Sequence, residues 1–172
     1  MDKKNILRHI KSFIPLVVLC FFIPYFILIY EKKRMVKPIF TASDSLQKTG
    51  IIMIIIGLIL IIYTIRIFIV KGKGTIMPWH PTRKLVVVGL YAYVRSPMIL
   101  CILIILLGAS FVLSSFGLIL LTFVTWLLNT IYFIYSEEPG LEKRFGQDYI
   151  RYKRNVRRWI PRLTPWRPNK NK

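Results

Sequence analysis

Four long apolar blocks constrain the fold of this chain more than any other feature. They cover about residues 13–30, 51–70, 98–113 and 116–135, and the last two contain no charged residue. Because a helix needs roughly 20 apolar residues to cross a hydrocarbon core of ~30 Å, the blocks predict about four transmembrane helices, the third of them short. With 55% hydrophobic residues among 172, the chain is predicted to be an all-α integral membrane protein.

The chain shows no internal repeat and no linker long enough to separate two domains. We therefore expect one membrane domain over residues 1–172, with N-terminal helices in 1–70 and a segment rich in motifs over 71–162. The two cysteines, Cys20 and Cys101, lie inside apolar runs and predict neither a disulfide nor a metal site.

The net charge of +19 comes from 26 basic and 7 acidic residues, and the basic residues border the apolar blocks. This distribution predicts contact with lipid headgroups and no nucleic-acid partner. Short basic segments stay on the cytosolic side, so residues 71–97 and the C-terminal segment are predicted to be cytosolic. The loop at 31–49 would then lie outside in spite of its lysines, as an exception to the rule.

An antiparallel pair formed by the third and fourth blocks would return two charged segments to the same membrane face. Arg95 precedes this hairpin, and Glu137 and Glu138 follow it. One interpretation is an Arg–Glu salt bridge that closes the hairpin, which leaves the second carboxylate without a partner. The other is a pocket for a zwitterionic amino-acid group, whose ammonium binds the glutamates and whose carboxylate binds Arg95 and free backbone N–H groups.

Residues 138–156 carry an apolar stripe at helical spacing. The stripe consists of Leu141, Phe145, Tyr149, Tyr152 and Val156. It predicts one amphipathic helix that lies in the membrane interface with its basic face toward water and headgroups. The segment from Arg162 to Pro168 is predicted to be irregular.

Before the hairpin, Gly89 is a candidate for a positive φ or a close backbone approach. Pro97 fits the first turn of the third helix.

At these positions the chain resembles the membrane methyltransferases that include isoprenylcysteine carboxyl methyltransferase and phospholipid methyltransferases, especially their short bacterial members. The resemblance covers about residues 72–162. It rests on His80, Gly89-x-Tyr91-xxx-Arg95-x-Pro97, Glu137-Glu138-x-x-Leu141-xxx-Phe145-Gly146-x-x-Tyr149-x-x-Tyr152 and Val156-x-Arg158-x-x-Pro161.

The resemblance implies an S-adenosylmethionine site in the C-terminal core, 71–162, with a lipophilic acceptor that enters from the bilayer. It implies a location in the bacterial plasma (inner) membrane, with the active site on the cytosolic side. The residues that carry over as cofactor-binding are His80, Gly89, Tyr91, Arg95, Pro97, Glu137 and Glu138. Of these, Arg95 and Glu138 are the candidate catalytic residues, and Tyr149, Tyr152 and Arg158 would close the pocket around the substrate.

The chain departs from the family pattern at two positions, where Ser96 replaces a His or Asn and Ile99 replaces a Tyr. Ile99 cannot make a polar contact, which puts one hydrogen bond to cofactor or acceptor in doubt.

Two other functions stay open: an NADPH-dependent membrane reductase of the steroid-reductase type, and a non-enzymatic membrane protein with a degenerate site. The acceptor also stays open among a prenylated protein C-terminus, a phospholipid amine, an isoprenoid-like lipid and a small thiol.

Overall fold

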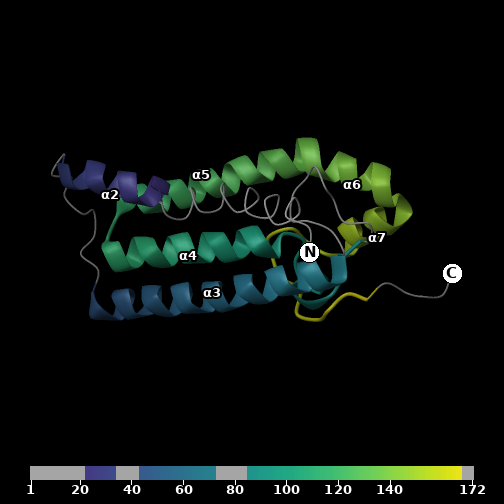
Figure 1. The fold of residues 1–172 in the computed structure, drawn as a ribbon, viewed down its shortest axis with the longest axis horizontal. Helices are drawn as coiled ribbons and strands as arrows, with labels where there is room; N and C mark the ends of the chain where they lie inside the picture. Colours follow the sequence, from purple (N-terminus) through teal and green to yellow (C-terminus); the bar gives the residue numbers. More distant parts are fainter. Residues whose placement is uncertain (1–21, 34–42, 73–84, 168–172) are drawn as a thin grey trace, which may run out of the picture. The chain divides into compact units, whose positions relative to one another are not determined.

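The computed structural model describes residues 22–33, 43–72 and 85–167, and Figure 1 shows their course. All regular elements in these ranges are helical, which confirms the all-α prediction for the described part. They are α2 (Ile23–Lys33), α3 (Asp44–Gly72), the 3₁₀ turn η2 (Gly89–Ala92), α4 (Pro97–Leu113), α5 (Phe116–Tyr132), the π-helical turn η3 (Phe133–Glu137), α6 (Glu138–Phe145) and α7 (Gln147–Asn155).

In the described ranges, two helices are long and apolar enough to cross a membrane. One is Asp44–Ile67 within α3, and the other is Phe116–Phe145, which α5, η3 and α6 form together. α4 is apolar but has only 17 residues, as predicted for the third block, and it begins at Pro97. Half of the first predicted block lies outside the described residues, so the count of four crossings stays a prediction.

The chain divides into two compact units. The first contains residues 1–59 and 101–127, and the second contains residues 60–100 and 128–172. Within the described ranges, the first unit includes α2, the N-terminal part of α3 and most of α4 and α5. The second includes the loop before α4, the end of α5, α6, α7 and the C-terminal tail.

In the first unit, glycines bring α3 and α4 close together in an antiparallel arrangement (Figure 1). A Cβ on Gly50 would lie 2.6 Å from the carbonyl oxygen of Gly108, and a Cβ on Gly108 would lie 2.7 Å from that of Gly50. A Cβ on Gly57 would lie 2.6 Å from Cγ1 of Ile105. Small residues of this kind allow membrane helices to pack backbone against backbone.

A carboxylate joins α2 to the turn between α4 and α5. The Glu31 Oε2 atom accepts a hydrogen bond from the Ser115 hydroxyl at 2.7 Å, and Oε1 accepts one from the Gly117 N–H at 2.8 Å. The Ser115 Oγ in turn accepts a hydrogen bond from the Leu118 N–H at 3.2 Å. Together these groups cap the first turn of α5, whose N–H groups lack partners within the helix.

In the second unit, the prediction of one helix over 138–156 is wrong, because two shorter helices cover this segment. Gly146 adopts a positive φ of 53°, and this residue separates α6 from α7. A left-handed backbone ends an α-helix, and glycine adopts it without a steric penalty from Cβ.

The surroundings of the apolar stripe also correct the prediction of an interfacial helix. Tyr149, Tyr152 and Val156 are buried in a core with Val87. Partly buried side chains pack against this core, namely Leu85, Leu141, Phe145 and Trp166. The stripe is therefore covered by the chain's own loop and tail rather than left for lipid.

The tail is irregular, as predicted, and it pairs with the loop before α4 through its backbone. The Arg162 N–H donates to the carbonyl of Tyr93 and the Trp166 N–H donates to that of Ala92, both at 2.9 Å. In the other direction, the Arg95 N–H donates to the carbonyl of Arg157 at 3.0 Å. These bonds hold Arg95 beside the tail.

Candidate functional site

Glu138 lies at the centre of a charged cluster in the second unit. The helix that starts as α5 widens into the π-helical turn η3 just before Glu138, and Pro139 follows within the first turn of α6. A π-helical turn changes the direction in which the next side chains point, and such turns are frequent at functional sites. Glu138 is only 6% exposed.

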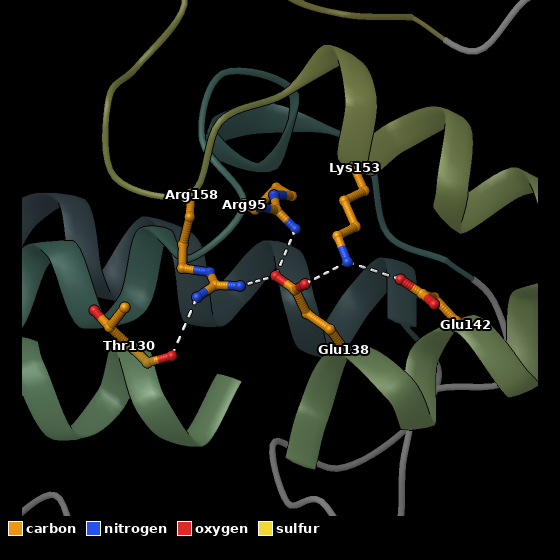
Figure 2. Close-up of polar contacts among 6 residues, drawn as sticks. All are labelled: Arg95, Thr130, Glu138, Glu142, Lys153 and Arg158. Carbon is orange, nitrogen blue, oxygen red and sulfur yellow. Dashed lines mark hydrogen bonds and ion pairs between the residues drawn. The ribbon is translucent and has the colours of Figure 1, made fainter. Parts of the chain in front are cut away.

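Three cations surround the Glu138 carboxylate (Figure 2). Arg95 Nη1 lies 2.8 Å from Oε1, and Arg158 pairs with the same oxygen. Lys153 Nζ lies 2.7 Å from Oε2 and also 2.8 Å from Oε1 of Glu142. Because a buried carboxylate is costly without counter-charges, these cations offset the cost of burying Glu138.

The cluster holds more positive than negative charge around Glu138. Arg95, Lys153 and Arg158 face Glu138 and Glu142, which leaves one positive charge in excess. Burial lowers the pKa of Arg158, the nearby Arg95 lowers it further, and Glu137 acts in the opposite direction. The two arginines thus repel each other across the carboxylate, which makes their pairing sensitive to any further anion.

Arg95 still has an unused donor. Its Nε is buried and has no hydrogen-bond partner among the described residues. A buried N–H without a partner costs about 1–3 kcal/mol, so an acceptor that reached it would bind with a corresponding advantage. The Nε–H of Arg95 can therefore donate to an oxygen other than that of Glu138.

Aromatic residues of α7 and the tail line the cluster. The rings of Tyr149 and Tyr152 lie 6.2 Å apart, and those of Tyr152 and Trp166 lie 5.7 Å apart. The Tyr152 hydroxyl donates to the carbonyl of Tyr91 at 2.7 Å. Burial raises the pKa of both tyrosines, which keeps their hydroxyls protonated as donors.

Arg158 connects the cluster to the end of α5. Its Nη1 donates to the carbonyl of Thr130 at 3.2 Å, and its guanidinium lies 5.5 Å from the ring centroid of Phe133 (Figure 2 shows the Thr130 contact). A residue from the tail therefore contacts the helix that carries Glu138 at three positions, Thr130, Phe133 and Glu138 itself.

The second unit also contains a cavity of about 1380 Å³. Its lining includes apolar and aromatic side chains of α3, the loop before α4, α6 and the tail, namely Tyr63, Leu85, Val87, Val88, Leu90, Tyr93, Phe145 and Trp166. One helical face of α7 adds Asp148, Arg151 and Asn155. The cavity and the cluster share the loop from Gly89 to Arg95, which lines the first and supplies a cation to the second.

Gly89 lines this cavity with the positive φ that the sequence predicted, 60°. A Cβ at this position would lie 2.2 Å from Cδ1 of Ile67. Both the backbone conformation and the close approach therefore require glycine.

The structure brings together many of the residues that the sequence singled out. Arg95, Glu138 and Arg158 form ion pairs, and Tyr149 and Tyr152 pack beside them. Tyr91 contributes its carbonyl, and Pro97 begins α4. Glu137 belongs to η3 and makes no ion pair with the described residues, while His80 lies outside them. Ser96 is buried and Ile99 is partly buried.

Sequence reasoning missed Lys153 and Glu142. Glu142 follows Glu138 by one helical turn, so a shared face could have been predicted from their spacing. Lys153 is one of many basic residues that follow Glu142, and nothing in its local sequence distinguishes it from its neighbours.

The described helices define an apolar membrane protein that carries a buried charged cluster. A family model described as phospholipid methyltransferase matches residues 46–148. The chain belongs to this family, whose members are methyltransferases that act on lipids. No curated protein and no solved structure matches the chain significantly.

Proposed function

We propose that this chain transfers a methyl group from S-adenosylmethionine to a lipophilic acceptor in the membrane. The observation that carries the proposal is the buried Glu138, held among Arg95, Lys153 and Arg158 within a chain of a methyltransferase family. Opposite charges at one site match the zwitterionic amino-acid end of this cofactor.

The donors and acceptors of the cluster fit that end of the cofactor. Arg95 offers its unpartnered Nε to a carboxylate, and Glu138 offers its carboxylate to an ammonium. Two guanidiniums side by side can bind a carboxylate more strongly than one because each charge-assisted hydrogen bond is short and directional. Glu137 and His80 belong to the same proposed site.

We assign the adenosine part of the cofactor to the cavity beside the cluster. Its apolar wall and its aromatic residues, Tyr63, Tyr93 and Trp166, suit a flat heteroaromatic ring, and Gly89 leaves space for close approach. Val88 is 43% exposed on this wall, so Val88→Trp can fill the cavity without disturbing a buried core. This variant should bind the cofactor less tightly, and an unchanged affinity with slower turnover would assign the cavity to the acceptor instead.

When bound, the cofactor supplies a methyl group on a positively charged sulfur. The chain's own residues hold the two ends of the ligand, keep water out and fix the direction of attack. A carboxylate or thiolate acceptor needs no base, whereas an amine acceptor must lose a proton, which Glu137 or His80 can accept. The acceptor enters from the bilayer, and the positive segments on both sides of the hairpin favour a cytosolic site.

Calorimetry on the detergent-purified protein tests the proposal directly. S-adenosylmethionine should bind and NADPH should not, and a methyl group labelled on the cofactor should appear in the lipid fraction when membranes are added. Binding of NADPH alone would favour a reductase, and binding of neither would favour a non-enzymatic protein. A label in a water-soluble product would overturn the lipophilic acceptor.

A further inference from the structure

The two oxygens of the Glu138 carboxylate are held in different ways. Oε1 contacts the guanidiniums of Arg95 and Arg158, whose side chains are 14% and 9% exposed. Among the described residues, Oε2 contacts the ammonium of Lys153 alone, whose side chain is 38% exposed. One side of the carboxylate is thus fixed by two buried groups, and the other by a single group with access to solvent.

Lys153 also forms an ion pair with a second carboxylate, that of Glu142. Its Nζ lies 2.8 Å from Oε1 of Glu142, which is 36% exposed and lies one turn after Glu138 on α6 (Figure 2). If the Lys153 ammonium moved away from Glu138, it would still pair with Glu142 and would gain hydrogen bonds to water. Because the ammonium lies at the end of a long flexible side chain, its shift from Glu138 to Glu142 needs no change in the backbone.

We infer that Lys153 occupies the place of the ligand's ammonium on Glu138 and is displaced onto Glu142 when the ligand binds. This inference rests on the proposed function and adds a competing residue that the family match does not supply. An alkylammonium from the chain and one from an amino-acid ligand carry the same charge and the same three donors, so either can satisfy Oε2. The exchange leaves the charge balance at Glu138 unchanged.

The inference has a consequence that a merely supporting lysine would not have. A competitor weakens ligand binding, so Lys153→Met should bind S-adenosylmethionine about two- to fivefold more tightly, the range expected for removal of a partly exposed ion pair. Glu142→Gln should act in the opposite direction, because Lys153 then has only Glu138 as a partner. In the double variant the effect of Glu142→Gln should disappear.

Two controls separate competition from a general change in charge. Lys143→Met removes an exposed lysine of α6 that makes no ion pair with the described residues, and it should leave the affinity unchanged. An S-adenosyl ligand without its α-ammonium does not displace Lys153, so Lys153→Met should give it no gain.

Calorimetry with these ligands on the full chain in detergent, with circular dichroism to verify folding, decides the question. Tighter binding by Lys153→Met that depends on the ligand's ammonium supports the inference. Weaker binding by this variant in a folded protein would mean that Lys153 positions Glu138, and it would overturn the inference alone. Absence of S-adenosylmethionine binding by the wild type would overturn the proposed function together with it.

Discussion

Glu31 in the first unit and Glu138 in the second are both held by several partners, but the partners differ in kind. Glu31 accepts hydrogen bonds from a hydroxyl and a backbone N–H at the start of α5. Glu138 is surrounded by three cations, one of which is partly exposed. Neutral donors fixed by a helix end hold a carboxylate in one place, whereas a partly exposed lysine can be exchanged for the cation of a ligand. We therefore assign the first carboxylate to the architecture and propose the second for ligand binding.

The largest effect is expected for variants that test whether ligand binding depends on the second unit. Arg95→Ala and Glu138→Ala should each weaken S-adenosylmethionine binding by on the order of 2–4 kcal/mol, because each removes one partner of a desolvated charged contact. Calorimetry on the folded variants measures this loss. Wild-type affinity in both would mean that the Arg–Glu pair only closes the hairpin.

Glycine contacts in the first unit should control stability without affecting binding. Gly108→Ala places a Cβ 2.7 Å from the carbonyl oxygen of Gly50, so α3 and α4 must separate at a cost of about 1–3 kcal/mol. Gly140→Ala is the matched control, since a Cβ there meets no atom within 4 Å. Thermal unfolding in detergent should show a lower Tm for the first variant only. Equal Tm values would argue against close helix packing.

The Glu31 contacts provide a sharper test of the same distinction. Glu31→Ala should reduce the free energy of unfolding by about 0.5–2 kcal/mol, the usual effect of losing a helix cap. The affinity for S-adenosylmethionine should stay at the wild-type value. A loss of affinity in a protein of unchanged Tm would show that Glu31 has a role in ligand binding.

The smallest effect is expected at Tyr152. Tyr152→Phe removes the hydroxyl that donates to the carbonyl of Tyr91 but keeps the ring against Tyr149 and Trp166. The free energy of unfolding should fall by roughly 0.5–1.5 kcal/mol, as for one hydrogen bond. Tyr135→Phe serves as the control because Tyr135 is 79% exposed. Equal losses in the two variants would remove the structural role assigned to the Tyr152 hydroxyl.

Local sequence features predicted the parts of the fold that depend on local physics. The apolar block before Ser114 and Pro97 at its start predicted α4 with the observed bounds. Gly89 predicted a positive φ, and the hairpin predicted that Arg95 and Glu138 would face each other across it.

The other features of the fold and the site depend on tertiary contacts that no side-chain pattern in the sequence indicates. The tail docks on the loop before α4 through backbone groups of Tyr93 and Arg162, which any sequence could provide. This docking buries Tyr149 and Tyr152, whose spacing equally suited a helix on the membrane surface. Lys153 joins the cluster only because Gly146 redirects the chain between α6 and α7.

The order of these residues along the chain also orders the assembly of the site during synthesis. Arg95 and the apolar hairpin leave the ribosome first, followed by Glu138, and the cations on α7 and the tail come last. Until Lys153 and Arg158 are synthesised, Arg95 is the one member of this set that can pair with Glu138, so the carboxylate at the end of an apolar helix lacks two of its three cations. Trp166 then closes the core over Tyr152. A chain that ends before Lys153 would therefore carry the hairpin and Arg95 but would lack two of the three cations that hold Glu138.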